Sequence, residues 1–196
     1  MERHPLQPFL PPNAKILMLG SFPPPQKRWS MDFFYPNMQN DMWRIFGFLF
    51  FADKEHFVDK VNKRFNQQML EQFLNEKGVA LYDTACAVER LQDNASDKFL
   101  EVVERTDVPH LLRQIPECMT IVTTGQKATD TLRSTFHCEE PQVGSYVEFE
   151  FESRSMRLFR MPSSSRAYPL KLEKKAEAYG AMFKMVGLLT EEAQKE

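Results

Sequence analysis

The chain has 196 residues, of which 42% are hydrophobic and 27% are charged, and its net charge is −2. This composition excludes a disordered chain and a protein that binds nucleic acid through its overall charge, and no stretch approaches the roughly 20 apolar residues of a transmembrane helix. The length predicts one domain over residues 1–196, with an extended, Pro-rich lead-in at 1–13 and a polar tail at 190–196.

The cysteine and histidine patterns bear on cofactors and cellular location. Cys86, Cys118 and Cys138 form no C-x-x-C pair, which argues against a disulfide framework, a zinc site and an iron–sulfur cluster. The histidines at positions 4, 56, 110 and 137 lack metal-ligand spacing, and each is expected to be a surface side chain or one satisfied inside the fold. We therefore predict no metal and no cofactor. The N-terminus lacks the apolar run of a secretory signal, so a cytoplasmic, monomeric protein with no membrane partner is expected.

The first part of the chain contains one predicted strand and two predicted helices. Ala14–Gly20 is a short apolar run that ends in glycine, which is typical of a buried parallel strand. An aromatic loop follows over Ser21–Gln39, and Met42–Phe51 is apolar nearly all round, which predicts a buried helix. In residues 58–77 an apolar residue recurs at every fourth position, and Gly78 stands where a helix-ending glycine belongs, so an amphipathic helix is expected. The recurring residues are Val61, Phe65, Met69 and Phe73.

Two further buried strands follow, with a short helix between them. Val79–Asp83 and Met119–Gly125 are the predicted strands, and the helix covers about 109–115 with Thr106 or Asp107 as its N-cap. The helix after the second of these strands places three apolar residues on one face, namely Ala128, Leu132 and Phe136.

The last part of the chain predicts a hairpin and a final helix. Residues 146–152 alternate strictly between apolar residues and Glu, which predicts a half-exposed, antiparallel edge strand. Arg157–Met161 is a short strand that Pro162 ends, and the last helix covers about 170–189. This order of elements predicts an α/β fold, a three-layer α/β/α sandwich with a mainly parallel sheet of about four strands and a small edge hairpin. Ligands of such sheets bind at the carboxyl ends of the strands.

Three segments at those ends carry polar or aromatic side chains, and each has two interpretations. In Gly20–Pro25, which lacks the glycine spacing of nucleotide-binding loops, Phe22 is either a ring at the strand end or ordinary core. Asn40 is either the N-cap of the next helix or an amide that pairs with the edge of a nucleobase. Met161–Pro169, in a stretch rich in Lys and Arg, is either a polar turn or a phosphate-binding loop.

Taken together, these segments resemble the uracil-DNA glycosylase superfamily. The resemblance rests on G-S-F-P at 20–23, Y-x-x-x-x-N-x-x-W at 35–43, L-Y-D at 81–83, T-G at 124–125 and P-S-S-S-x-A at 162–167. It is strongest to the family 6 branch, the hypoxanthine-DNA (deoxyinosine) glycosylases. It implies a uracil-DNA glycosylase-like α/β/α domain that flips a deaminated base, uracil or hypoxanthine, out of DNA and hydrolyses its N-glycosidic bond in base-excision repair.

The resemblance also implies a role for each matching residue. The base pocket would comprise Gly20, Ser21, Phe22, Pro23 and Tyr35, with Phe22 or Tyr35 stacking on the base. Asn40 would hydrogen-bond the leaving base. Asp83, which follows a predicted strand, is either a residue that positions water or a turn or cap residue. The DNA backbone would be held by Ser163, Ser164, Ser165, Arg166 and Lys171.

The chain departs from the better-known branches in its polar groups. Their first loop carries an Asp or Asn that orients water and their second often carries His, whereas Phe22 and Met161 stand here. Arg166 replaces an expected Pro, and Tyr168 replaces an expected Asn. We expect a monofunctional hydrolase with an oxocarbenium-like transition state, because no motif lysine in these loops could form a Schiff base. The alternatives are a glycosylase-fold protein that binds DNA or a nucleobase without cutting, and a protein-interaction domain that docks a partner through its aromatic loop.

Overall fold

The computed structural model describes residues 1–92 and 97–190, so the predicted polar tail lies outside the described residues from position 191 on. Its centre is a five-stranded sheet in the order β5-β2-β8-β10-β9. The strands are β2 (Ile16–Gly20), β5 (Val79–Asp83), β8 (Thr120–Thr124), β9 (Tyr146–Phe151) and β10 (Arg154–Met161). Four of them run parallel, and β9 pairs antiparallel with β10 at one edge. The predicted α/β class and edge hairpin are confirmed, while the predicted count of about four strands is one too low.

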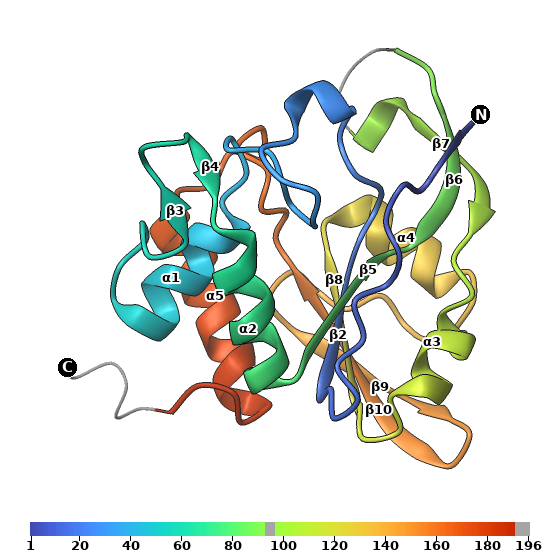
Figure 1. Cartoon of the computed structure of the whole chain (residues 1–196). Helices are drawn as coiled ribbons and strands as arrows, with labels where there is room; N and C mark the ends of the chain where they lie inside the picture. The colour runs from blue at the N-terminus through green and yellow to red at the C-terminus, as the bar shows by residue number, and fades with distance from the viewer. Residues whose placement is uncertain (93–96, 191–196) are drawn as a thin grey trace.

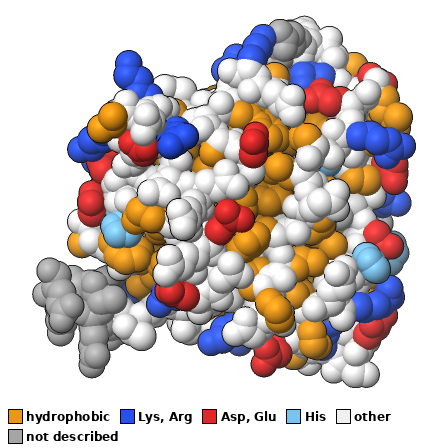
Figure 2. Space-filling view, in the orientation of Figure 1, with side chains coloured by type: hydrophobic (Ala, Val, Ile, Leu, Met, Phe, Trp, Pro, Cys, Tyr) orange, Lys and Arg blue, Asp and Glu red, His pale blue; other side chains and the backbone are white. Residues whose placement is uncertain are grey.

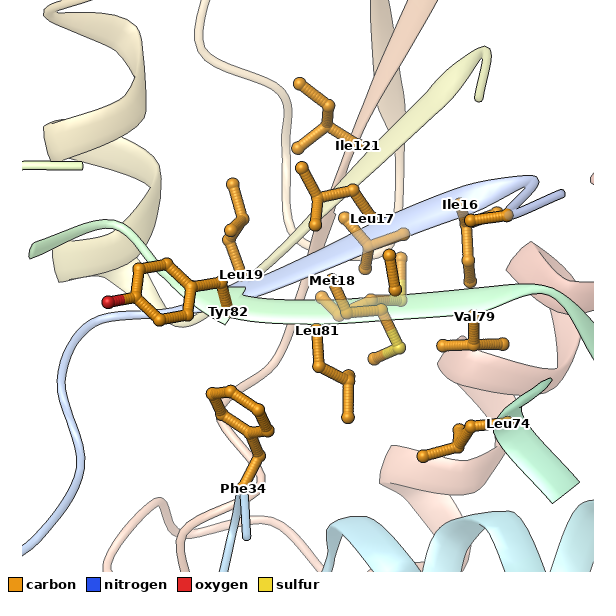
Figure 3. Packing of buried hydrophobic residues seen from close by; sticks show 14 of the residues in the cluster. Ile16, Leu17, Met18, Leu19, Phe34, Leu74, Val79, Leu81, Tyr82 and Ile121 are labelled. Atoms are coloured by element: carbon orange, nitrogen blue, oxygen red, sulfur yellow. The ribbon is translucent and has the colours of Figure 1, made fainter. Parts of the chain in front are cut away.

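The central strand β2 is buried along its whole length, because side chains cover both faces of the sheet. Figure 3 shows Met18 and Leu81 on one face of β2 and β5, with Leu17 and Ile121 on the other. This burial explains why the strand reads as an unbroken apolar run rather than an alternating one.

Five α-helices surround the sheet. They are α1 (Met42–Phe51), α2 (Gln67–Lys77), α3 (Val108–Gln114), α4 (Gln126–Arg133) and α5 (Leu172–Met185). Figure 1 shows α1, α2 and α5 on one side of the sheet and α3 and α4 on the other. Asp107, one of the two predicted N-cap residues, caps α3 by accepting a hydrogen bond from the His110 N–H. None of the helices within the described ranges is long and apolar enough to cross a membrane.

The helix predicted over residues 58–77 is shorter than expected. Its first part forms a small hairpin of β3 (Val58–Asp59) and β4 (Arg64–Phe65), and α2 begins only at Gln67. Asn66 caps that helix, with its side chain accepting a hydrogen bond from the Met69 N–H. Val61, which the periodicity placed in the core, is 90% exposed. The four-residue spacing therefore continued by coincidence across a turn and a cap.

The helix predicted at Met42–Phe51 has the expected bounds, whereas the last helix is shorter than predicted at both ends. The last helix starts at Leu172 rather than near Pro169, and it ends at Met185. In α1 most positions are buried, but Phe48 and Phe51 are exposed. The helix is therefore apolar even on a side that the rest of the protein does not cover. The ring of Phe51 stacks on His56 at 3.7 Å between centroids.

A second sheet was not anticipated. It has the order β1-β6-β7 and is formed by β1 (Glu2–Arg3), β6 (Ala85–Arg90) and β7 (Leu100–Arg105). The 3₁₀ helix η2 (Asp97–Phe99) leads into β7, and another, η1 (Gln26–Arg28), lies in the aromatic loop. The lead-in at 1–13 is extended as predicted, but it is paired with the rest of the chain through β1 and through a bridge between Phe9 and Leu81. It therefore contributes residues to the end of the main sheet.

Candidate active site

A cavity of about 370 Å³ opens at the carboxyl ends of β2, β5, β8 and β10. Its volume lies in the range of roughly 300–1,000 Å³ that small-molecule sites occupy. Most of the residues predicted from the sequence line it, namely Gly20, Ser21, Phe22, Pro23, Tyr35, Asn40, Asp83, Ser163, Ser164 and Ser165. The remaining two, Arg166 and Lys171, line a neighbouring hollow with Asp41 and Arg44. A larger hollow of about 800 Å³, beside Trp29 and the start of α2, contains none of them.

Two polar side chains on the lining of the cavity, Asp83 and Tyr35, come close to Gly20. A Cβ at Gly20 would lie 2.6 Å from Asp83 Oδ1 and 3.2 Å from the Tyr35 hydroxyl. Only glycine therefore lets this carboxylate and phenol converge there. Tyr35 itself has a φ of 50°, and its hydroxyl lies 3.1 Å from Thr124 Oγ1. Burial raises the pKa of the Tyr35 phenol well above its usual value, and the Asp83 charge raises it further, so Tyr35 is a neutral hydrogen-bonding group.

The carboxylate of Asp83 is held by a residue from the lead-in. His4 Nε2 lies 2.7 Å from Asp83 Oδ2, and both side chains are buried. Since His4 Nδ1 accepts a hydrogen bond from the Leu6 N–H, the proton of a neutral ring is on Nε2, which donates to Asp83. The ring also stacks on Tyr82 at 4.5 Å. Asp83 Oδ2 is thus fixed, and Oδ1 is presented toward Gly20.

Replacing His4 with Phe is expected to lower the free energy of unfolding by about 1–3 kcal/mol, because it leaves a buried carboxylate without its donor. The substitution keeps a ring against Tyr82, so the loss reports the hydrogen bonds of His4 to Asp83 and Leu6 rather than the stacking. Urea unfolding measures it. His56→Phe is the matched control, since His56 stacks on Phe51 and has no ion pair among the described residues. Equal stability of the two variants would contradict the role assigned to His4.

Asn40 lies at the start of α1, although it is not the N-cap residue of that helix. The N-cap position of α1 is Asp41, whose side chain makes no capping bond. The Asn40 Oδ1 instead accepts a hydrogen bond of 2.9 Å from the Met42 N–H at the helix start. Within residues 1–92 and 97–190, no protein group accepts a hydrogen bond from its Nδ2. The oxygen is therefore anchored, and the side chain lines the cavity with its two N–H donors available.

The second loop is joined to the Asn40 segment by a buried ion cluster. Lys175 is 0% exposed, and its Nζ donates to Asp41 Oδ2 at 3.1 Å and to the Ser165 carbonyl at 2.9 Å. Arg166 Nε donates to the other oxygen, Asp41 Oδ1, at 3.1 Å. Asn40 and Ser165 form an antiparallel bridge. The cluster thus fixes the two loops against each other on one side of the cavity.

The Lys- and Arg-rich stretch at 154–175 is not a single basic patch. Arg154 donates to the carbonyls of Leu112, Ile115 and Cys118. Arg160 pairs with Glu140, and Lys175 is buried. Figure 2 shows Lys and Arg side chains spread around the margin of one face, with hydrophobic side chains gathered near its centre. Much of this charge therefore serves the fold.

Phe22 and Met161 are both buried. They are the two apolar residues that the family resemblance placed where polar groups were expected. Phe22 is 7% exposed and packs in a small cluster with Ala85, Val88 and Leu100, although it also lines the cavity. Met161 belongs to the main core. Phe22 and Tyr35 both line the cavity, and Tyr35 is the more exposed of the two.

Sequence reasoning missed Asp97 and Lys127, which also line the cavity. Asp97 Oδ1 accepts a hydrogen bond of 2.6 Å from Ser21 Oγ in the first loop. Burial raises the pKa of Asp97, while the Ser21 hydrogen bond opposes the rise. The residues of β6 and β7 alternate only in part, so they indicate only weakly the strands on either side of the segment that carries Asp97. Within the described residues, no three His, Cys, Asp or Glu side chains gather as metal ligands.

Comparison with known proteins supports the fold. No protein-family model and no curated protein matches the sequence. Among solved structures, the chain is similar to a protein from Methanosarcina acetivorans, determined by solution NMR and described as a candidate uracil DNA glycosylase. The two are 21% identical, with a TM-score of 0.63, and the match covers 94% of this chain and 98% of that one. The similarity therefore extends over nearly the whole of both chains.

Proposed function

We propose that the chain is a monofunctional DNA glycosylase that flips uracil or hypoxanthine out of DNA and hydrolyses the N-glycosidic bond. The observation that carries the proposal is the cavity at the strand ends, where the glycosylase-like residues come together from separate loops. The likeness in fold to the Methanosarcina protein is consistent with this. Flipping is cheapest at mispaired bases, which favours the products of deamination.

The donors of Asn40 would act on the leaving base. As the glycosidic bond breaks, negative charge develops on the base and its carbonyl oxygen. Two N–H donors on an amide that is already anchored can stabilise this charge without reorganising. Tyr35 would stack on the flipped base, with Phe22 closing the wall behind it, and Gly20 to Pro23 would form the first side of the pocket.

The second loop would hold the distorted DNA backbone. Ser163, Ser164 and Ser165 line the cavity, and hydroxyl and backbone N–H groups are common phosphate contacts. Arg166 and Lys171 would lie beside the strand that leaves the pocket, since both are exposed in the neighbouring hollow. Asp83, which His4 orients, would position water.

An oligonucleotide panel tests the proposal. Single- and double-stranded DNA containing uracil, hypoxanthine or xanthine would be incubated with the protein, and free base and strand breaks would be measured. We expect release of a deaminated base and strand cleavage only after alkali. Because Lys127 lines the cavity, borohydride trapping belongs in the same panel and should yield no covalent complex. Salt-dependent DNA binding without base release would show a binding protein instead.

A further inference from the structure

Asp97 occupies a distinctive place in the cavity. It begins η2 in the segment between β6 and β7, and its Oδ1 is tied to the first loop by Ser21 Oγ at 2.6 Å. Its other oxygen, Oδ2, lies 3.9 Å from the position that a Cβ would take at Gly125. The carboxylate therefore lies between the ends of β2 and β8, on the lining of the cavity.

The chemistry of the proposed reaction requires such a group. Departure of a base leaves positive charge on the sugar, and the water that attacks C1′ must lose a proton. Phe22 and Met161 can serve neither need. Asp83, to which the positioning of water is assigned, has one oxygen hydrogen-bonded to His4 and the other beside Gly20. Asp97 is the second carboxylate of the cavity, and its Ser21 hydrogen bond fixes its orientation.

The groups around Asp97 act on its pKa in both directions, and the net effect is a raised pKa. Burial raises its pKa most strongly, and the Asp83 charge on β5 raises it as well. Ser21 in the first loop, Lys127 on α4 and Arg90 on β6 act in the opposite direction. A carboxylate with a raised pKa is a stronger base than an exposed one and loses its activity at a higher pH when acidified.

We propose that Asp97 is a catalytic residue, which accepts the proton of the attacking water and faces the cationic sugar. In this step the C1′–N bond breaks with its electron pair going to the base, and the water oxygen forms a bond to C1′. The proton of that water moves to the Asp97 carboxylate and then to the departed base anion. The inference rests on the proposed glycosylase function.

Kinetics of Asp97→Asn give the first test. This variant keeps an oxygen for the Ser21 hydroxyl but cannot accept a proton, so its single-turnover rate should fall by about 10²–10⁴-fold. The wild-type rate should decline as pH falls through the raised pKa of Asp97, and this decline should disappear in the variant. Ser21→Ala removes a contact that lowers the pKa, so it should move the decline to higher pH. Glu101→Gln, an exposed carboxylate on β7 of the same hairpin, is the control. A near-wild-type rate for Asp97→Asn would overturn the proposal.

DNA binding separates failure of this inference from failure of the proposed function. Duplexes would carry either a cationic pyrrolidine or a neutral tetrahydrofuran in place of the abasic sugar. Wild-type protein should prefer the pyrrolidine by about tenfold or more, as one close charge pair in a partly buried site can provide, and Asp97→Asn should lose that preference. Equal preference in both proteins would overturn the role of Asp97 alone. Failure to bind either duplex, together with no base release, would overturn the proposed function and this inference with it.

Discussion

Asn40→Asp is expected to lower the single-turnover rate of base release by about 10²–10³-fold, the usual effect of removing a donor to a developing anion. The substituted carboxylate can still accept the hydrogen bond from the Met42 N–H, so the start of α1 should be unaffected. It offers no N–H to the leaving base, and its negative charge opposes the charge that develops there. Rapid-quench measurement of base release, with unfolding followed by urea, gives both quantities.

Asn40→Ala provides the matched comparison. It removes the donors and the anchoring oxygen together, so it should lose a similar factor in rate and also about 1 kcal/mol of stability, as loss of a helix-start acceptor does. The pair of variants thus separates the two functions of one side chain. If Asn40→Asp keeps a rate near that of wild type, the amide acts only at the helix start, and another group must stabilise the leaving base.

The parallel sheet could be predicted from the sequence because its strands are buried on both faces. Ile16–Gly20 and Val79–Asp83 read as short, mainly apolar runs. Thr120–Thr124 places Ile and Val among threonines, which are also enriched in strands. Parallel strands also end at the same edge, so the loops that follow them could be expected to meet without knowledge of their contacts. The cavity lined by Gly20, Asn40 and Ser163 follows from that rule.

Local periodicity could not reveal where α2 begins. Hydrophobic spacing extended across residues 58–65, but Asp59 accepts hydrogen bonds from Asn62 in a turn and Asn66 caps the next helix. These short polar contacts compete with helix formation and override the apolar pattern. Asn62 and Asn66 therefore indicate the start of α2 better than the apolar spacing through Val61 does.

His4 and Asp97 could not be placed from the sequence because each reaches the cavity through pairing of distant segments. His4 follows β1, which pairs with β6, and Asp97 begins η2, which leads into β7, the other partner of β6. The sequence separation from Asp83 is 79 residues for His4, so no local motif connects the two. Their contacts depend on the second sheet, which alternation in β6 and β7 only weakly indicates.

Lys175→Met is expected to destabilise the protein by about 3 kcal/mol, at the lower end of the cost of breaking a buried ion pair. The substitution leaves the buried Asp41 carboxylate with Arg166 as its remaining cation and removes the donor to the Ser165 carbonyl. Because that carbonyl belongs to the second loop, DNA binding should weaken as well. Lys174→Met is the matched control, since Lys174 is exposed and pairs only with the exposed Glu177 among the described residues.

A second substitution at Asp41 distinguishes lost charge pairing from lost packing. The double variant Asp41→Asn, Lys175→Met removes both buried charges, so most of the stability lost in Lys175→Met should return. Asp41 makes no capping bond to α1, so its own replacement should not weaken the helix start. Arg166 would lose its charged partner, but it also donates to Gln39 Oε1 and can be solvated, as its side chain is 44% exposed. If the double variant is as unstable as the single one, the buried lysine supports the loops through packing and the Ser165 hydrogen bond instead of through its charge.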